Sequence, residues 1–299
     1  MRRALLVVAL LALLPQAAAA WPPEMMTALG RDARRLLPRS LSRLLGERET
    51  EIVRELERFP PEIARALAVD LPAGRLQPET IAALEHEADR VVEMLREGQV
   101  SPGLVRLGAL LRIPADLCDP VLAGVPEGWP PGLVREYYGL LSAHFDRMPV
   151  VLDGPTPLDA SRVRLPELWQ SLLDRTRPQA PVIHRELFRS GRVVDHRRLD
   201  YRSPAWAVAS LSYSRAVTGI AATWLAVWRE ARGDTTRMPR ARTVDPADAE
   251  PVARDDEPPA AGTAPVAPDD DPVAADPSPD GPAPAPVPAD ERPEAPEAE

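Results

Sequence analysis

The sequence predicts an all-α fold in a single domain, and three observations support this prediction. Long stretches repeat apolar residues three and four positions apart, the spacing that places them on one face of a helix. Segments that alternate apolar and polar residues, as half-buried strands do, are missing from the sequence. Between two ends of distinct composition lie about 220 residues, which are enough for one domain with a substantial core.

Residues 1–20 have the pattern of a secretory signal peptide. Arg2 and Arg3 precede an apolar run, and small residues end the segment at Ala18–Ala20, as signal peptidase requires. The run is too short to span a membrane, because a spanning helix needs about 20 apolar residues. We therefore expect an exported protein, periplasmic or extracellular, whose mature chain begins at Trp21.

Residues 240–299 form a predicted disordered tail. Residues 241–299 hold 15 Pro, 16 Asp plus Glu and 3 Arg with no aromatic residue, a composition that buries too little apolar surface to offset chain entropy. This segment carries a formal charge of −13, whereas residues 1–240 carry +4. The net charge of −9 therefore belongs to the tail, for which a solvating or spacer role is expected.

Residues 21–239 form the predicted helical domain. The last of its helices is expected to start at Ser203 as N-cap with Pro204 at the first helical position. Arg215 and several hydroxyl side chains interrupt its apolar surface, so we expect a buried central helix rather than a membrane span. Periodic apolar residues predict helices within 22–38, 40–59, 79–98, 101–113, 130–148, 162–177 and 203–234.

Several common catalytic groups are missing from the sequence. Cys118 is the only cysteine, so no internal disulfide can form, and a free cysteine is most often a small buried hydrophobe. The chain has no lysine and no G-x-S-x-G motif, which argues against lysine-based and serine-esterase chemistry. No two histidines have His-x-x-x-His spacing, and His86 is expected on a solvated helix face. His184 and the pair Asp195–His196 are expected in an irregular segment, where a metal or catalytic role is the less favoured alternative.

Residues 110–120 read LLRIPADLCDP and contain a candidate binding pair. Arg112 and Asp116 are four residues apart, so a helix places both on one face and allows an ion pair. Pro114 lies between them and removes a backbone donor, so we expect it to bend the helix. Asp119 and Pro120 end the segment.

The combination of these features resembles the zinc-dependent phospholipase C family and its single-strand nuclease relatives. The shared features are the expected mature N-terminal Trp21, an N-terminal helix, the Asp116-x-x-x-Pro120 turn and a long last helix with Trp224 and Trp228. The resemblance implies an all-helical phosphoesterase with a trinuclear zinc cluster. In that family the mature Trp binds zinc through its amino group and carbonyl oxygen, and His and Asp side chains complete the cluster.

Most of the zinc ligands that the resemblance implies are absent from this sequence. Trp21 and Asp116 stand where the family has ligands, but Arg112, Leu122 and Met26 stand where it has histidines. A thioether is a poor zinc ligand, and an arginine is already a cation.

Two further acids match the family's pattern in part. Asp70 corresponds to a loop aspartate without the accompanying histidine. Glu136 corresponds to the acid of another helix, and Gly132 stands where that helix has its histidine. In the alternative alignment, Tyr138 stands at the position of the acid and Val134 at the position of the histidine.

We therefore expect a fold that is retained and a zinc-dependent phosphodiesterase activity that is lost. The protein would act as a binding or structural module without a cofactor, with phospholipid, another anionic ligand or a protein as partner. The arginine-rich stretches 30–45 and 195–202 could contact anionic lipid, although nucleic acid is not the expected partner.

The alternative is a residual metal-dependent hydrolase of phospholipid or nucleic acid. Its ions would be held by the amino group of Trp21 with Asp70, Asp116 and Glu136. The family chemistry implies zinc as the cofactor, although such a set of mainly oxygen ligands suits Mg²⁺ or Ca²⁺ better.

Overall fold

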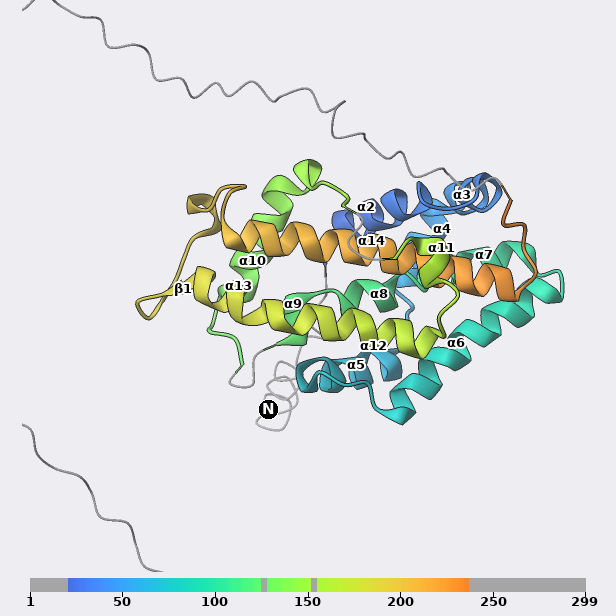
Figure 1. The fold of residues 1–299 in the computed structure, drawn as a ribbon, viewed down its shortest axis with the longest axis horizontal. Coiled ribbons are helices and arrows are strands. Elements are labelled where there is room, and N and C mark those ends of the chain that lie inside the picture. Colours follow the sequence, from blue (N-terminus) through green and yellow to red (C-terminus); the bar gives the residue numbers. More distant parts are fainter. Residues whose placement is uncertain (1–20, 125–127, 152–154, 237–299) are drawn as a thin grey trace, which may run out of the picture. The chain divides into compact units, whose positions relative to one another are not determined.

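The computed structural model describes residues 21–124, 128–151 and 155–236, and the domain in this part of the chain is all-α, as the sequence predicts (Figure 1). The predicted signal peptide lies outside the described residues. So does the predicted tail from residue 240 onward. Among the residues that the structure describes, no helix combines the length and the apolar character needed to cross a bilayer.

The first half of the domain consists of helices joined by short turns. They are α2 (Pro23–Arg34), α3 (Arg39–Gly46), α4 (Glu49–Leu56), α5 (Pro61–Ala73), α6 (Pro78–Arg96), α7 (Val100–Ala109), α8 (Arg112–Leu117) and α9 (Pro120–Ala123).

The second half adds more helices and one small hairpin. The helices are α10 (Leu133–His144), α11 (Pro157–Ala160), α12 (Leu165–Thr176), α13 (Ala180–Leu187) and α14 (Pro204–Glu230), with the 3₁₀ turns η1 (Phe145–Arg147), η2 (Arg177–Gln179) and η3 (His196–Arg198). Strands β1 (Phe188–Arg189) and β2 (Arg192–Val193) pair antiparallel, with Phe188 opposite Val193.

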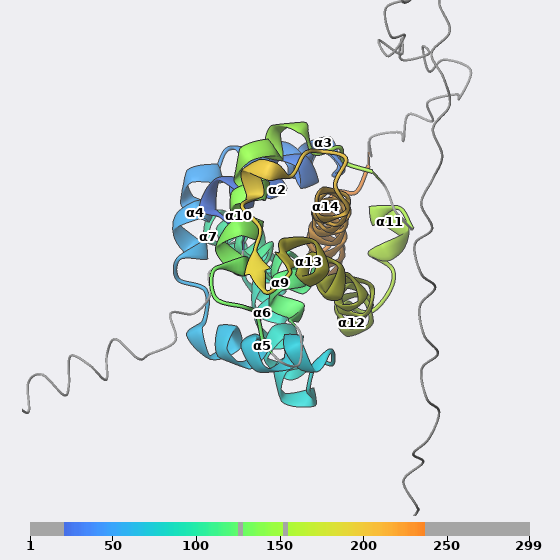
Figure 2. The same ribbon diagram turned by 90° about the vertical axis from the view of Figure 1, so that its left-hand side faces the viewer.

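Helix α14 is the central element of the domain. Figures 1 and 2 show it running along the bundle, and α2, α8, α12 and α13 all pack against it. Several of its polar side chains find partners inside the bundle: Thr223 accepts a hydrogen bond from the indole of Trp169 (3.2 Å), and Ser212 donates one to Gln179 (2.7 Å). These internal partners explain how a mostly apolar helix tolerates so many hydroxyl groups.

The start of α14 has the predicted cap. Pro204 is the first helical residue, and the Ser203 hydroxyl accepts a hydrogen bond from the backbone N–H of Trp206 at 3.2 Å. We expect Ser203→Ala to lower the free energy of unfolding by about 1 kcal/mol, because that N–H loses its acceptor. Urea unfolding followed by circular dichroism measures the change. Ser203→Asp keeps an acceptor at the cap and should stay near the parent, and equal loss in both variants would contradict the capping role.

The predicted helix over 101–113 is wrong in its extent, because the structure divides this stretch into α7 and α8. The break at Leu110 and Leu111 places Pro114 in the first turn of the new helix. A proline has no N–H to donate, and in the first turn of a helix that donor is not needed. Pro114 therefore sets the position of a helix start instead of bending a continuous helix.

Two other expectations about helices need correction. The predicted helix over 40–59 is divided into α3 and α4, after Gly46, a poor helix former. His184 lies on α13 and not in an irregular segment. Helices α5 and α13 are not among the predicted helices, because Pro61 and Pro181 look like helix breakers but stand in the first turn.

Candidate functional site

Helix α8 holds the predicted Arg112–Asp116 pair. The guanidinium Nε of Arg112 lies 2.8 Å from Oδ2 of Asp116, whose residue is only 4 % exposed. Burial raises the pKa of Asp116, and the neighbouring guanidinium opposes that rise. The other carboxylate oxygen, Oδ1, accepts no hydrogen bond from any residue that the structure describes. The turn thus contains a buried ion pair with one oxygen left over.

Trp21 lies against the same turn. Its residue is 2 % exposed, and its indole N–H donates a hydrogen bond to the carbonyl oxygen of Ala115, one residue before Asp116 (2.8 Å). The ring of Tyr213 from α14 meets the indole edge-on, with 6.3 Å between the ring centroids. The structure therefore brings Trp21 together with the Arg112–Asp116 turn. The contact is made by the indole side chain, and not by the amino group and carbonyl oxygen through which the family's Trp binds zinc.

A second buried acid, Asp119, lies at the start of α9. Its Oδ1 accepts from the backbone N–H of Val121 and its Oδ2 from the hydroxyl of Tyr138, both at 2.8 Å. Burial raises the pKa of Asp119 to about 7, and the hydrogen bond from Tyr138 only partly offsets this effect. The adjacent Tyr137 is fully buried, and its hydroxyl has no hydrogen-bond partner within the described part of the chain. Asp119, Tyr137 and Tyr138 form a buried polar cluster.

The remaining candidate ligands have partners of their own. The carboxylate of Asp70 is buried and accepts from the backbone N–H of Gln77 at 2.8 Å, which closes the turn after α5. Glu136 faces His196 and not Asp116. Met26 is buried in the hydrophobic core. Asp70, Asp116 and Glu136 are therefore each engaged with a different partner.

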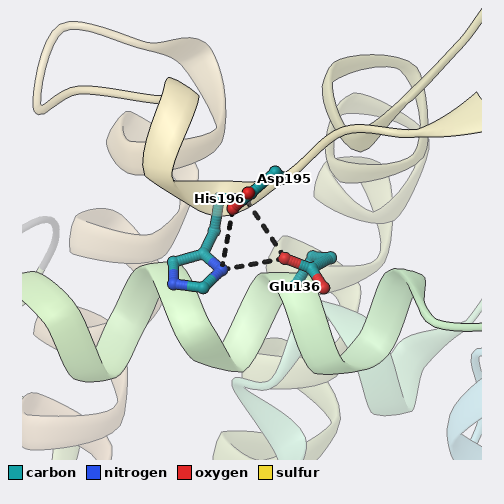
Figure 3. A group of neighbouring side chains, drawn as sticks. All are labelled: Glu136, Asp195 and His196. Atoms are coloured by element: carbon teal, nitrogen blue, oxygen red, sulfur yellow. Dashed lines mark hydrogen bonds and ion pairs between the residues drawn. The ribbon is translucent and has the colours of Figure 1, made fainter.

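Glu136, Asp195 and His196 form the one group of three metal-ligating side chains whose ligand atoms lie within 4.8 Å of one another in the described residues (Figure 3). Oε2 of Glu136 lies 2.8 Å from Nδ1 of His196 and also accepts from the His196 backbone N–H at 3.2 Å. Oδ1 of Asp195 lies 3.7 Å from the same ring nitrogen. The hydrogen bonds from His196 lower the pKa of Glu136 to about 2, so this carboxylate stays ionised.

Gly139 makes room for the ring of His196 on α10. A Cβ atom at Gly139 would lie 2.8 Å from both Cε1 and Nδ1 of that ring. Glycine inside a helix normally costs about 1 kcal/mol relative to alanine. Glycine occurs at position 139 despite this cost because the missing Cβ permits close contact between the imidazole and the helix.

We expect Gly139→Ala to give no gain in stability, because the new methyl group displaces the His196 ring and cancels the better helix propensity. In a His196→Ala background the same substitution should raise the free energy of unfolding by about 1 kcal/mol. Chemical denaturation of the four proteins in this cycle measures the difference. The same gain in both backgrounds would contradict the contact.

Cys118, His144 and His184 serve packing. Cys118 is fully buried, and burial raises its pKa to about 12, so it remains a neutral thiol. His184 lies between Trp129 and Phe188, with centroid distances of 6.2 and 5.4 Å. The ring of His144 meets Trp206 at nearly a right angle.

The arginines of residues 30–45 lie mostly in surface ion pairs. Arg31 and Arg34 both reach Glu49, and Arg35 lies 2.8 Å from Asp32. The Arg31 and Arg35 side chains are exposed, as is typical of solvated helix faces, and their pairs contribute little to stability, whereas the Arg34 side chain is largely covered.

A pocket of about 210 Å³ opens between α11, α12 and α14. Leu168, Leu172 and Ala222 provide apolar lining. The charged residues of the lining are two arginines, Arg175 and Arg215, and one acid, Glu167. Nη1 of Arg215 donates to the backbone carbonyl oxygen of Arg175 at 2.7 Å, which ties the Arg215 side chain to α12. Apolar lining beside positive charge suits a ligand with an apolar part and an anionic group.

No protein-family model, no curated protein and no solved structure matches this chain.

Proposed function

We propose that this protein is an exported helical binding module that resembles zinc-dependent phospholipase C but no longer carries out its reaction. One observation carries the proposal: the guanidinium of Arg112 contacts the buried carboxylate of Asp116 at 2.8 Å. In the family that the sequence resembles, a metal ion faces this acid. A fixed guanidinium charge at that position pairs with the carboxylate without any cofactor.

The binding role is supported by the pocket beside α14. Its wall includes Gly219 on α14, which lies against Leu172 of α12 and Pro114 of α8. Arg175 and Arg215 supply the positive charge that an anionic lipid headgroup would contact, and the apolar lining suits a short length of acyl chain. An anionic phospholipid is therefore the proposed ligand class.

Two measurements on the purified mature chain test this function. Hydrolysis of a phosphodiester substrate should be absent with and without chelator, and short-chain phosphatidylglycerol should bind more tightly than phosphatidylcholine of the same chain length. Arg215→Gln should weaken phosphatidylglycerol binding about tenfold, since it removes a charged hydrogen-bond donor. The matched control is Arg185→Gln, because that arginine is exposed on α13. Diester hydrolysis abolished by chelator, with about three zinc ions per chain, would contradict the proposal.

The alternative function, a residual metal-dependent phosphoester hydrolase, is favoured by one observation. Oδ1 of Asp116 is buried and accepts no hydrogen bond from the described residues, so it could face an ion. The same assay separates the two functions. In the alternative, activity would need added Mg²⁺ or zinc and would be lost in Asp116→Asn.

A further inference from the structure

We propose that Glu136, Asp195 and His196 bind one divalent metal ion of the zinc class. The site joins α10 to the turn η3 and contains neither Arg112 nor Asp116. It goes beyond the proposed function, which requires no metal. Three protein ligands would leave room for water on the ion.

The positions of the three side chains fit such an ion. Two ligands about 2.1 Å from a zinc ion at tetrahedral or octahedral angles lie about 3.0 to 3.4 Å apart. The observed separations from Nδ1 of His196 are 2.8 Å to Glu136 and 3.7 Å to Asp195. All three ligand atoms lie within 4.8 Å of one another, so side-chain adjustments without backbone movement would place them around one ion. Figure 3 shows them facing one another across the gap between the helix and the turn.

The surrounding backbone already holds the ligands in place. Asp195 caps η3 by accepting from the backbone N–H of Arg197 at 3.0 Å, and the His196 backbone N–H donates to Glu136. Gly139 allows the imidazole to lie directly on α10. Ligands that are fixed before binding lose less conformational entropy when the ion arrives.

The charges of the site favour a divalent cation. The site contains two carboxyl side chains, which suit a cation, and the Glu136 side chain is only 13 % exposed. Arg135 contacts the other oxygen of Glu136, Oε1, at 3.0 Å, and its own side chain is 82 % exposed. Water therefore screens this guanidinium strongly, and Oε2 remains directed at His196.

The imidazole determines the class of metal. Nitrogen ligands suit zinc and its transition-metal neighbours, whereas Mg²⁺ and Ca²⁺ prefer all-oxygen sites. The combination of one imidazole and two carboxylates is a common zinc ligand set. We therefore expect Zn²⁺ to bind and Mg²⁺ to bind far more weakly.

Titration calorimetry with Zn²⁺ on the metal-stripped, tag-free mature chain tests the site. One ion should bind per chain. His196→Ala and Asp195→Asn should each weaken binding at least about tenfold, since loss of even an outer partner of a ligand costs 10- to 100-fold. Asn at position 195 can still cap η3, so this variant removes the charge and preserves the turn. His86→Ala, which changes an exposed histidine on α6, should bind like the parent.

Circular dichroism of each variant establishes that the helices are retained. Absence of Zn²⁺ binding by the parent, or binding that is unchanged in both His196→Ala and Asp195→Asn, would overturn the proposal. The result is separable from that for the proposed function. Loss of zinc binding in Asp116→Asn would contradict the proposed function. Loss of zinc binding in His196→Ala and Asp195→Asn, but not in Asp116→Asn, supports the site proposed here.

Discussion

Arg112→Leu is expected to lower the free energy of unfolding by about 3 to 5 kcal/mol, because it leaves the buried Asp116 carboxylate without its counter-charge. Asp116 is 4 % exposed, so water cannot replace the guanidinium without opening the turn. Urea unfolding at pH 8, followed by the helical circular dichroism signal, measures the loss. Removal of Arg112 also removes the group that opposes the raised pKa of Asp116.

The loss should shrink at lower pH. Since the folded-state pKa of Asp116 is raised, the folded protein retains this proton while the unfolded chain has already lost it, and a neutral carboxyl needs no counter-charge. The double variant Arg112→Leu/Asp116→Leu should regain most of the lost stability at pH 8, because it removes both charges. A single Arg112→Leu variant as stable as the parent at pH 8 would contradict the buried ion pair.

Asp119→Ala is expected to cost about 2 to 4 kcal/mol, because it removes the cap of α9 and leaves the Tyr138 hydroxyl buried without an acceptor. Both contacts are 2.8 Å long, and Asp119 is fully buried. Asp119→Asn is the matched control, since its amide oxygen can still accept hydrogen bonds. Chemical denaturation at pH 5 should rank the parent and Asp119→Asn close together, with Asp119→Ala well below both.

The pH dependence of Asp119 has a definite sign. Its folded pKa of about 7 lies above the unfolded value of 3.8, so between these values the folded state binds the proton more tightly. Stability from this group is therefore greatest at low pH and falls as pH rises to about 7, by at most about 1.4 kcal/mol per pH unit. Asp119→Asn has no carboxyl group to titrate at this position, so its free energy of unfolding should rise relative to that of the parent between pH 5 and pH 8. A constant difference across that range would contradict the raised pKa.

The sequence predicts the fold class and its central helix because these depend on local signals. The spacing of apolar residues predicts α2, α6 and α14, and the Ser203–Pro204 start of α14 is found where it is expected. Prolines are the main reason that the observed helix boundaries differ from the predicted ones. Pro61 and Pro181 mark helix starts, and Pro114 marks where α8 begins, since a first turn does not need the donor that proline lacks.

The candidate sites depend on contacts that spacing alone does not reveal. Arg112 and Asp116 are four residues apart, and their contact follows from helix geometry. Glu136 and His196 are 60 residues apart, and only the packing of η3 against α10 brings them together. His196 and Asp200 have helical spacing, but η3 ends at Arg198, and Asp200 instead accepts from the backbone N–H of Arg202.

The burial of polar groups is the other feature that the sequence does not predict. Asp119 looks like an ordinary residue at the end of a helix, and the neighbouring Tyr137 and Tyr138 look like core aromatics. Only the tertiary structure shows that one carboxylate accepts from Tyr138 inside the core while the Tyr137 hydroxyl is left without a partner in the described residues. An Asp-Pro helix start with a Tyr pair on another helix was the available signal.

Anomalous diffraction at the zinc edge, from crystals of the mature protein grown with Zn²⁺, tests most directly whether Arg112 has taken the place of a metal beside Asp116. We predict one anomalous peak among Glu136, Asp195 and His196, and none within bonding distance of Asp116, whose Oδ2 should still contact Arg112. An anomalous peak bonded to Asp116, with the Arg112 side chain displaced, would contradict this prediction.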